Sequence, residues 1–223
     1  MKETPMLFNA PMVRAILAGQ KTQTRRAMKM PHGLWETSAL GLVPIPVGCP
    51  FGKPGDRLWV RESFRIGEDL GEDWEDGMDV GNRFPIYQAD GEHGRYGVVP
   101  LEWEPPRNAR EVHNSEGTAE HWRSFGPIPS IHMPRWACRL VLEITDVRVE
   151  RLQAISEADA DAEGFAGGYP WELAPDIFTA PHDRWGSLTI PECFGVLWSS
   201  INGKASWDAN PWVWVIEFKR VTA

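Results

Sequence analysis

One short stretch, residues 19–26 (Gly-Gln-Lys-Thr-Gln-Thr-Arg-Arg), concentrates side chains that can donate hydrogen bonds and bind anions. It places one lysine, two hydroxyls and two arginines within six residues. An arginine such as Arg26 could hold a developing oxyanion or a phosphate group. A stretch of this composition is also common in solvated connections, so composition alone leaves a site and a plain loop both open.

The segment before this stretch is expected to be a short helix that positions it. Pro11 suits the first turn of a helix and Gly19 suits its end. Four apolar residues between them recur at helical spacing and form one face: Met12, Val13, Ile16 and Leu17. After Gly19 the chain must turn, so the polar groups are presented from a loop that a packed helix holds in place.

Alternation along the loop decides which side chains face the same way. If the loop continues into a strand, Thr22 and Thr24 project from one face of it. Lys21, Gln23 and Arg25 then project from the other face, although a long lysine side chain can still curl across the turn.

Length and cysteine content bound the class of protein. With 223 residues the chain can bury a sizeable core in one elaborated domain. No stretch of eighteen apolar residues occurs, and the first residues lack the apolar region of a secretory signal. We therefore expect a cytoplasmic protein with no membrane partner. The three cysteines have no metal-ligand spacing, so we expect no disulfide framework, no metal and no other cofactor: Cys49, Cys138 and Cys193.

The charge distribution is uneven along the chain. The net charge of −8 argues against indiscriminate binding to a nucleic-acid backbone. Residues 1–66 nevertheless carry +6 and the remainder −14, and a local basic surface can exist on an acidic protein. Seven acidic residues between positions 68 and 79 predict a solvated loop. A calcium-binding loop is not favoured, because the spacing of that motif is missing. The twelve tryptophans suit a core, or platforms on which bases stack.

Apolar residues that recur with the period of a strand or of a helix predict the main secondary-structure elements. Alternation predicts strands over 57–64, 139–149 and 212–218. Ser156 and Asp159 resemble a capping box that opens a helix over 157–163, and a second helix begins at Pro191 and ends near residue 202. Several short strands with only three helices indicate an α+β fold, and favour a small, partly closed β-barrel with flanking helices.

The segments between these elements look irregular. Residues 27–54 are rich in Pro and Gly, which predicts a long loop, and residues 90–130 are interpreted as an insertion. Residues 84–89 are a candidate for one further short strand.

Four stretches make the chain resemble the ASCH-domain proteins, a branch of the PUA-like β-barrels, and in particular their larger phage- and prophage-encoded members. These stretches are residues 16–26 (ILAGQKTQTRR), 54–58 (PGDRL), 152–164 and 213–218 (VWVIEF). The resemblance implies one ASCH/PUA-like domain over residues 1–223. Its long loop insertions would lie at 27–53, 66–133 and 165–188.

The resemblance also implies an activity and a set of site residues. Small ASCH proteins similar to this one include amidohydrolases that remove the acetyl group from N4-acetylcytidine. By motif position, the resemblance implies Thr24 as nucleophile, Lys21 as base and Glu163 as acid, with no cofactor. The candidate substrate-binding residues are Thr22, Arg25, Arg26 and Arg61. Related ASCH domains are suspected of binding RNA or other nucleic acid, and some cleave it, so a non-catalytic reader of modified bases and a ribonuclease stay open as alternatives.

The implied chemistry sets a condition on Lys21. A lysine accepts a proton from a hydroxyl only when it is neutral. Lowering its pKa from about 10.4 to about 7.4 costs on the order of 4 kcal/mol. Burial and the like charges of Arg25 and Arg26 would lower that pKa, whereas an ionised Glu163 nearby would raise it. Glu163 is therefore expected to protonate the leaving amine rather than to pair permanently with Lys21.

Both functions predict a geometry. For the hydrolase, Lys21, Thr24 and Glu163 should lie within about one water-bridged hydrogen bond of each other, in a pocket walled by at least one tryptophan. For the reader, the basic face of residues 14–65 should contact phosphates while one or two tryptophans stack a base.

Overall fold

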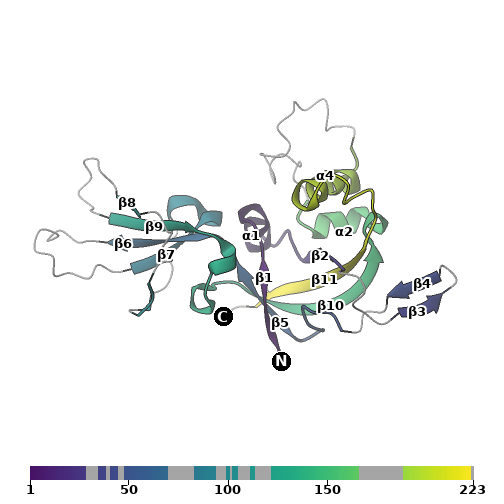
Figure 1. The fold of residues 1–223 in the computed structure, drawn as a ribbon, viewed down its shortest axis with the longest axis horizontal. Helices are drawn as coiled ribbons and strands as arrows, with labels where there is room; N and C mark the ends of the chain where they lie inside the picture. Colours follow the sequence, from purple (N-terminus) through teal and green to yellow (C-terminus); the bar gives the residue numbers. More distant parts are fainter. Residues whose placement is uncertain are drawn as a thin grey trace, which may run out of the picture. The chain divides into compact units, whose positions relative to one another are not determined.

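The computed structural model describes ten segments of the chain, and they form a mixed α+β fold, as the sequence predicts (Figure 1). The described residues are 1–28, 35–38, 41–44, 48–69, 83–93, 99–100, 102–104, 111–113, 122–165 and 188–221. The chain divides into two compact units. The first unit comprises Met1–Pro5, Arg14–Leu58 and Leu140–Ala223, and the second comprises Met6–Val13 and Trp59–Arg139.

The larger sheet has five strands in the order β1-β5-β10-β11-β2. Their bounds are β1 (Glu3–Leu7), β5 (Arg57–Arg61), β10 (Val141–Arg151), β11 (Trp212–Val221) and β2 (Gln23–Ala27). The three strands predicted from alternation are confirmed as neighbours, since β5, β10 and β11 are adjacent. Among the described residues no pairing joins β1 to β2, so these strands form an open sheet and the predicted partly closed barrel is not confirmed.

Helix α1 (Ala10–Leu17) confirms the predicted helix before the polar stretch. It begins after Asn9, whose Oδ1 accepts a hydrogen bond of 3.0 Å from the backbone amide of Met12 and so caps the first turn. The helix ends at Gly19, which has a φ of +74°. The amides of Gln20 and Lys21 then both donate to the carbonyl of Ala15, at 2.9 and 3.1 Å. The chain therefore reverses within two residues, and Lys21 lies against the helix end.

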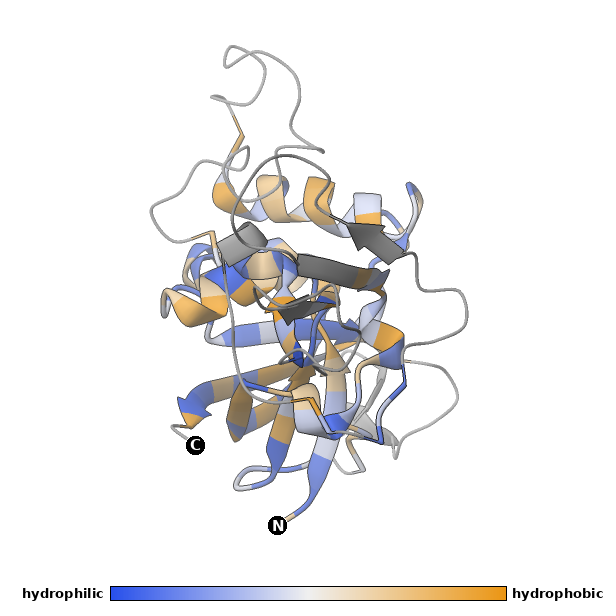
Figure 2. Ribbon diagram, turned by 90° about the vertical axis from the view of Figure 1, so that its left-hand side faces the viewer, coloured by the Kyte–Doolittle hydropathy of each residue, from blue (hydrophilic) through white to orange (hydrophobic). Residues whose placement is uncertain are grey.

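Helices α2 (Glu157–Ala162) and α4 (Ile190–Asn202) each begin with a capping box, built from Ser156 and Asp159 in α2 and from Thr189 and Glu192 in α4. They lie over β10 and β11 in Figure 1. In Figure 2, apolar residues recur along α4, the uppermost helix of that view. The buried residues that join the two helices to β11 are Leu152, Ile155, Ala160, Phe165, Cys193, Phe194, Trp198, Val213 and Val215. This core fixes α2 against one face of the sheet.

The second unit contains a four-stranded sheet that the sequence analysis largely missed. Its order is β7-β6-β9-β8, with bounds β6 (Phe64–Asp69), β7 (Arg83–Tyr87), β8 (Glu111–His113) and β9 (Trp122–Ile128). Strand β7 confirms the candidate at 84–89. Strands β8 and β9 lie within residues 90–130, which were interpreted as an insertion and for which no strand was predicted. Strand β9 reads Trp-Arg-Ser-Phe-Gly-Pro-Ile, which does not alternate, so its sequence gave no period to detect.

Other segments complete the described chain. Residues 27–54, predicted as a loop, include a hairpin of β3 (Trp35–Ser38) and β4 (Gly41–Pro44). Most of the acidic stretch at 68–79 lies outside the described residues. Within the described part of the chain, the short 3₁₀ helices are η2 (Gln88–His93), η3 (Ser130–His132), η4 (Arg135–Ala137) and η5 (Leu152–Ala154).

Among the helices described, none is both long enough and apolar enough to cross a membrane.

Candidate functional site

The polar stretch after Gly19 meets the end of α2, as the sequence analysis predicted. Lys21 and Glu163 pair in an isolated antiparallel bridge, and the amide of Thr22 donates to the carbonyl of Ala162 at 2.9 Å. Glu163 is the C-cap residue of α2 and is followed by Gly164, which has a φ of +110°. A Cβ at Gly164 would also lie 3.4 Å from the Cβ of Lys21. Glycine therefore permits both the turn and the close approach.

Lys21 and Glu163 form a buried pair. Lys21 Nζ donates to Glu163 Oε2 at 2.7 Å and to the Glu163 backbone carbonyl at 2.9 Å. The two side chains are 1% and 5% exposed. Burial lowers the pKa of Lys21, and the charges of Arg26 and Arg25 lower it further, whereas the Glu163 carboxylate opposes the shift. The net direction is downward, as a lysine base requires.

Arg25 holds the same carboxylate by its other oxygen. Its Nη1 donates to Glu163 Oε1 at 3.3 Å, and its Nη2 donates to Glu150 Oε2 at 3.1 Å and lies 3.5 Å from Asp159 Oδ2. The Arg25 side chain is fully buried, with its guanidinium 6.0 Å from the centre of the Phe194 ring. Glu163 is thus held by a different cation at each carboxylate oxygen.

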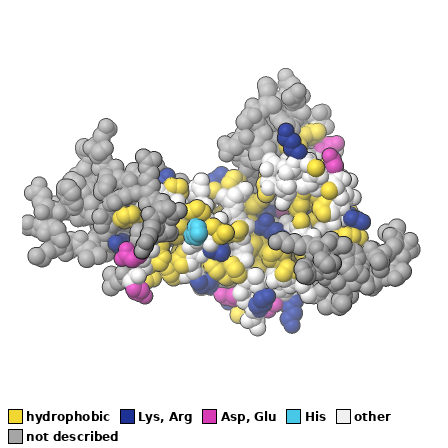
Figure 3. Space-filling model, viewed as in Figure 1, with side chains coloured by type: hydrophobic (Ala, Val, Ile, Leu, Met, Phe, Trp, Pro, Cys, Tyr) yellow, Lys and Arg dark blue, Asp and Glu magenta, His cyan; other side chains and the backbone are white. Residues whose placement is uncertain are grey.

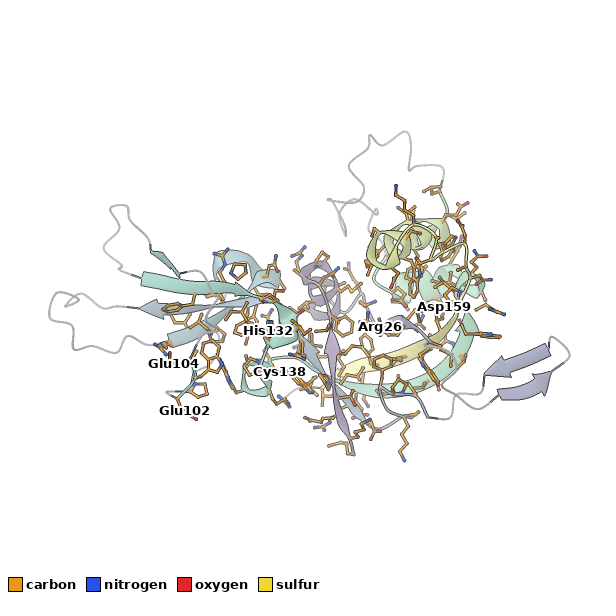
Figure 4. All side chains as sticks on the ribbon, viewed as in Figure 1. Arg26, Glu102, Glu104, His132, Cys138 and Asp159 are labelled. Carbon is orange, nitrogen blue, oxygen red and sulfur yellow. The ribbon has the colours of Figure 1, made fainter. Side chains whose placement is uncertain are left out.

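Arg148 extends these contacts toward solvent. It donates to Glu150 Oε1 at 2.6 Å, to Asp159 Oδ1 at 2.7 Å and to Gln23 Oε1 at 3.1 Å, and it also contacts Glu217. We call the whole group the Lys21 cluster. It comprises Lys21, Gln23, Arg25, Arg148, Glu150, Asp159, Glu163 and Glu217, and Figure 4 labels Asp159 on α2.

Strand register explains why these residues meet. Val215 of β11 lies opposite Arg148 of β10 on one side and opposite Arg25 of β2 on the other. Directly opposed residues share a face of a sheet, so both arginines face α2. Burial alone would raise the pKa of Asp159, but hydrogen bonds from Ser156 and the Arg25 charge outweigh it and lower that pKa. The Asp159 carboxylate is therefore ionised between the guanidinium groups of Arg25 and Arg148.

Thr24 lies on the opposite face of β2. It is 2% exposed and pairs with Ile216, whereas Gln23 and Arg25 both reach Asp159 on the α2 side. Alternation thus places Thr24 on the face opposite Gln23 and Arg25, as the sequence predicted. Within the described part of the chain, the hydrogen bonds of Lys21 and Glu163 do not include Thr24, so the structure brings together two of the three predicted catalytic residues by direct contact.

The predicted substrate-binding residues have different environments. Thr22 is exposed, and Arg26 (labelled in Figure 4) is half-buried on β2, where burial lowers its pKa against the opposing charge of Glu163. Arg25 is buried within the cluster. Arg61 belongs to the second unit, where it donates to the Ile131 carbonyl and lies 5.4 Å from the Trp59 ring, so it is not part of the Lys21 cluster.

Aromatic residues back the cluster from the α4 side. The ring beneath Arg25 is that of Phe194, and Trp198 and Trp207 pack against it with centroid distances of 6.1 and 6.3 Å. These tryptophans pack on Phe194, and the predicted tryptophan wall stays a prediction.

Sequence reasoning missed five members of the cluster as site residues: Gln23, Arg148, Glu150, Asp159 and Glu217. Arg148 and Glu150 alternate in the polar half of β10, and Glu217 interrupts an apolar strand. These patterns do not indicate which residues the three side chains contact. Asp159 was interpreted only as a cap. Its second oxygen, which the cap does not need, binds Arg148.

Comparison with known proteins identifies no relative: no family model, curated protein or solved structure matches the chain. Within the described residues, no group of three or more His, Cys, Asp or Glu side chains is arranged to hold a metal ion.

Proposed function

We propose that this chain is an ASCH-type amidohydrolase that acts on an N4-acylated cytidine or a related modified nucleoside without a metal ion. One observation carries the proposal, the buried lysine whose nitrogen makes two hydrogen bonds to Glu163. A neutral amine has two N–H donors and one lone pair. Because both donors of Lys21 have acceptors on Glu163, the lone pair of the neutral form is left to accept a proton.

The proposed reaction passes one proton along three groups. Thr24 lies on the face of β2 opposite Arg25, so the proposed first step requires Lys21 Nζ to reach across the strand end. Lys21 Nζ then takes the proton of the Thr24 hydroxyl, and the oxygen forms a bond to the acyl carbon of the substrate. The proton moves across the 2.7 Å hydrogen bond to Glu163 Oε2. Glu163 then donates it to the departing amine nitrogen as the carbon–nitrogen bond breaks. Water hydrolyses the resulting ester and regenerates the hydroxyl. Arg26 stabilises the negative oxygen of the intermediate.

The sequence led us to expect that Glu163 would not pair permanently with Lys21, because such a pair would hinder the base, whereas the two side chains form a buried ion pair. We infer that this pair gives Glu163 a larger role than the sequence suggested. In a buried pair, however, the proton belongs to both groups, and the protonation steps are properties of the pair. Lys21 and Glu163 can therefore act as one proton-transfer unit.

The environment of the basic stretch favours this function over a reader of nucleic acid. Phosphate contacts need cations that face solvent. Lys21 and Arg25 are buried and paired with carboxylates. On the face shown in Figure 3, Lys and Arg side chains stand apart among hydrophobic and uncharged surface. Two of the charges on which a reader would depend are thus already neutralised within the protein.

Hydrolysis of N4-acetylcytidine tests the proposal. The purified protein should release cytidine and acetate, which chromatography separates from the substrate. Thr24→Ala should reduce the rate to near background. Thr145→Ala, a change of the same size at an exposed position on β10, should leave it unaltered. Full activity in Thr24→Ala would overturn the assignment of roles, and binding of oligonucleotides without hydrolysis of any acylated nucleoside would favour the reader.

A further inference from the structure

The contacts of Arg25 suggest a task beyond structural support. A buried guanidinium binds the catalytic carboxylate at Oε1, on the side opposite Lys21. It shares its remaining contacts between Glu150 and Asp159, which are themselves held by Arg148. Arg25 is thus the residue through which the half-exposed outer charges reach the buried pair.

We propose that Arg25 is a positioning residue that sets the ionisation order of the Lys21–Glu163 pair, so that Glu163 is ionised and Lys21 neutral in the resting enzyme. This inference rests on the proposed function. Arg25 disfavours a second cation at Lys21 by repulsion, and by binding Oε1 of Glu163 it weakens the attraction of that carboxylate for a charged Lys21. Both effects withdraw a proton from Lys21.

The other charges near the pair act in both directions. The charged and titratable residues on the elements packed around it are Arg14 on α1, Arg26 on β2, Glu143, Asp146, Arg148, Glu150 and Arg151 on β10, Glu217, Lys219 and Arg220 on β11, Glu157, Asp159 and Asp161 on α2, and Glu192 and Cys193 on α4. Among them, Glu150 and Asp159 compete with Glu163 for Arg25. Removing Arg25 and removing one of its competitors should therefore shift the titration of Lys21 in opposite directions.

The consequence for catalysis is a shift in the pH dependence of the rate. Because the active form contains neutral Lys21, kcat/KM should rise with pH through the titration of the pair. In Arg25→Met this rise should move to higher pH by about one unit or more. In Arg25→Lys, which keeps the charge, it should return close to the wild-type position. In Glu150→Gln it should move to lower pH, because Arg25 then binds Glu163 without that competitor.

Arg148→Met is the matched control, since Arg148 contacts Glu150 and Asp159 but not Glu163. It should shift the rise by less than half as much as Arg25→Met. A purely structural Arg25 would instead lower the rate equally at every pH and leave the position of the rise unchanged. That result in Arg25→Met and Glu150→Gln would overturn the inference.

A second measurement separates this inference from the proposed function. The side-chain carbon signals of Lys21 report its pKa by nuclear magnetic resonance in the absence of substrate. An upward shift in Arg25→Met and a downward shift in Glu150→Gln support the role of Arg25 even if no substrate is hydrolysed, which would sink only the proposed function. Hydrolysis by the wild type with no shift in either variant would sink only the role of Arg25.

Discussion

The two compact units each bury a charged cluster, and the two clusters differ in what their groups can still do. In the second unit, Arg139 donates to both oxygens of Glu62 at 2.9 and 3.0 Å and also binds Asp90. Its guanidinium lies 4.0 Å from the centre of the Tyr87 ring. We call these four residues the Arg139 cluster. In the first unit, the Lys21 cluster contains a buried lysine in addition to its arginines.

The difference lies in which cation can lose its proton. Burial alone would lower the pKa of Arg139, but the hydrogen bonds that Arg139 donates to Glu62 and Asp90 outweigh it and raise that pKa. The pKa of Lys21 moves in the opposite direction, because burial outweighs Glu163. An arginine locked between carboxylates supports the fold, whereas a lysine with a lowered pKa can take part in proton transfer. The comparison teaches that burial and pairing alone do not mark a site.

The largest expected effect concerns the catalysis that we propose for the Lys21 cluster. Lys21→Met should lower kcat/KM for the acylated nucleoside by about 10²- to 10⁴-fold, because the proposed general base is lost. Steady-state kinetics would measure this. The protein should remain folded, since Glu163 keeps Arg25 as a partner at 3.3 Å. If Lys21→Met retains activity within about threefold of the wild type, the distinction between the clusters fails.

The next effect is on stability and concerns the Arg139 cluster. Arg139→Met should lower the free energy of unfolding by about 3–5 kcal/mol, because Glu62 is left buried without its partner. Denaturant unfolding would measure the loss. Wherever the variant is folded, its pH profile of hydrolysis should keep the wild-type shape. A changed profile would show that this cluster also takes part in proton transfer.

A smaller effect is expected in the pH dependence of stability. The folded-state pKa of Lys21 lies below its unfolded value of 10.5, so the unfolded chain binds more protons at this position. The wild type should therefore gain stability relative to Lys21→Met as the pH rises from the folded pKa toward 10.5. Chemical unfolding of both proteins across that range gives the difference. A difference that shrinks with rising pH would mean that folding raises the pKa of Lys21.

The smallest effect is expected for an exposed ion pair, which belongs to neither buried cluster. Lys219 and Glu143 form an ion pair of 2.8 Å on neighbouring strands, but their side chains are 62% and 30% exposed. Lys219→Ala should change the free energy of unfolding by less than about 1 kcal/mol, because water already screens the pair. A loss as large as that in Arg139→Met would show that burial is not what separates the pairs.

Local signals predicted much of the framework. The capping pair in α2 and the alternation of Leu58 and Val60 with Arg57 and Arg61 in β5 each occur within a few residues. Both elements could therefore be found from the sequence. Strand β9 could not be found, because a strand without alternation takes its structure from its neighbours in the sheet.

The candidate site was predicted only in part, because some of its contacts follow from local sequence and others depend on distant strands. Lys21 and Glu163 were identified by family resemblance, and their contact follows from the turn after Gly19. The partners Arg148 and Glu150 depend on the register of β10 against β11, which single strands do not encode. Glu62 and Arg139 are 77 residues apart, and no local pattern links them.

The pKa of Lys21 in the wild-type protein tests the central claim most directly. The chain has six lysines, so a sample labelled with ¹³C at lysine side chains gives a simple spectrum, and Lys21→Met assigns the Lys21 signal. We predict that Lys21 titrates below the other lysines and below 10.5. Titration of Lys21 together with the exposed lysines, or above them, would contradict the account, because a permanently charged Lys21 could not act as the base.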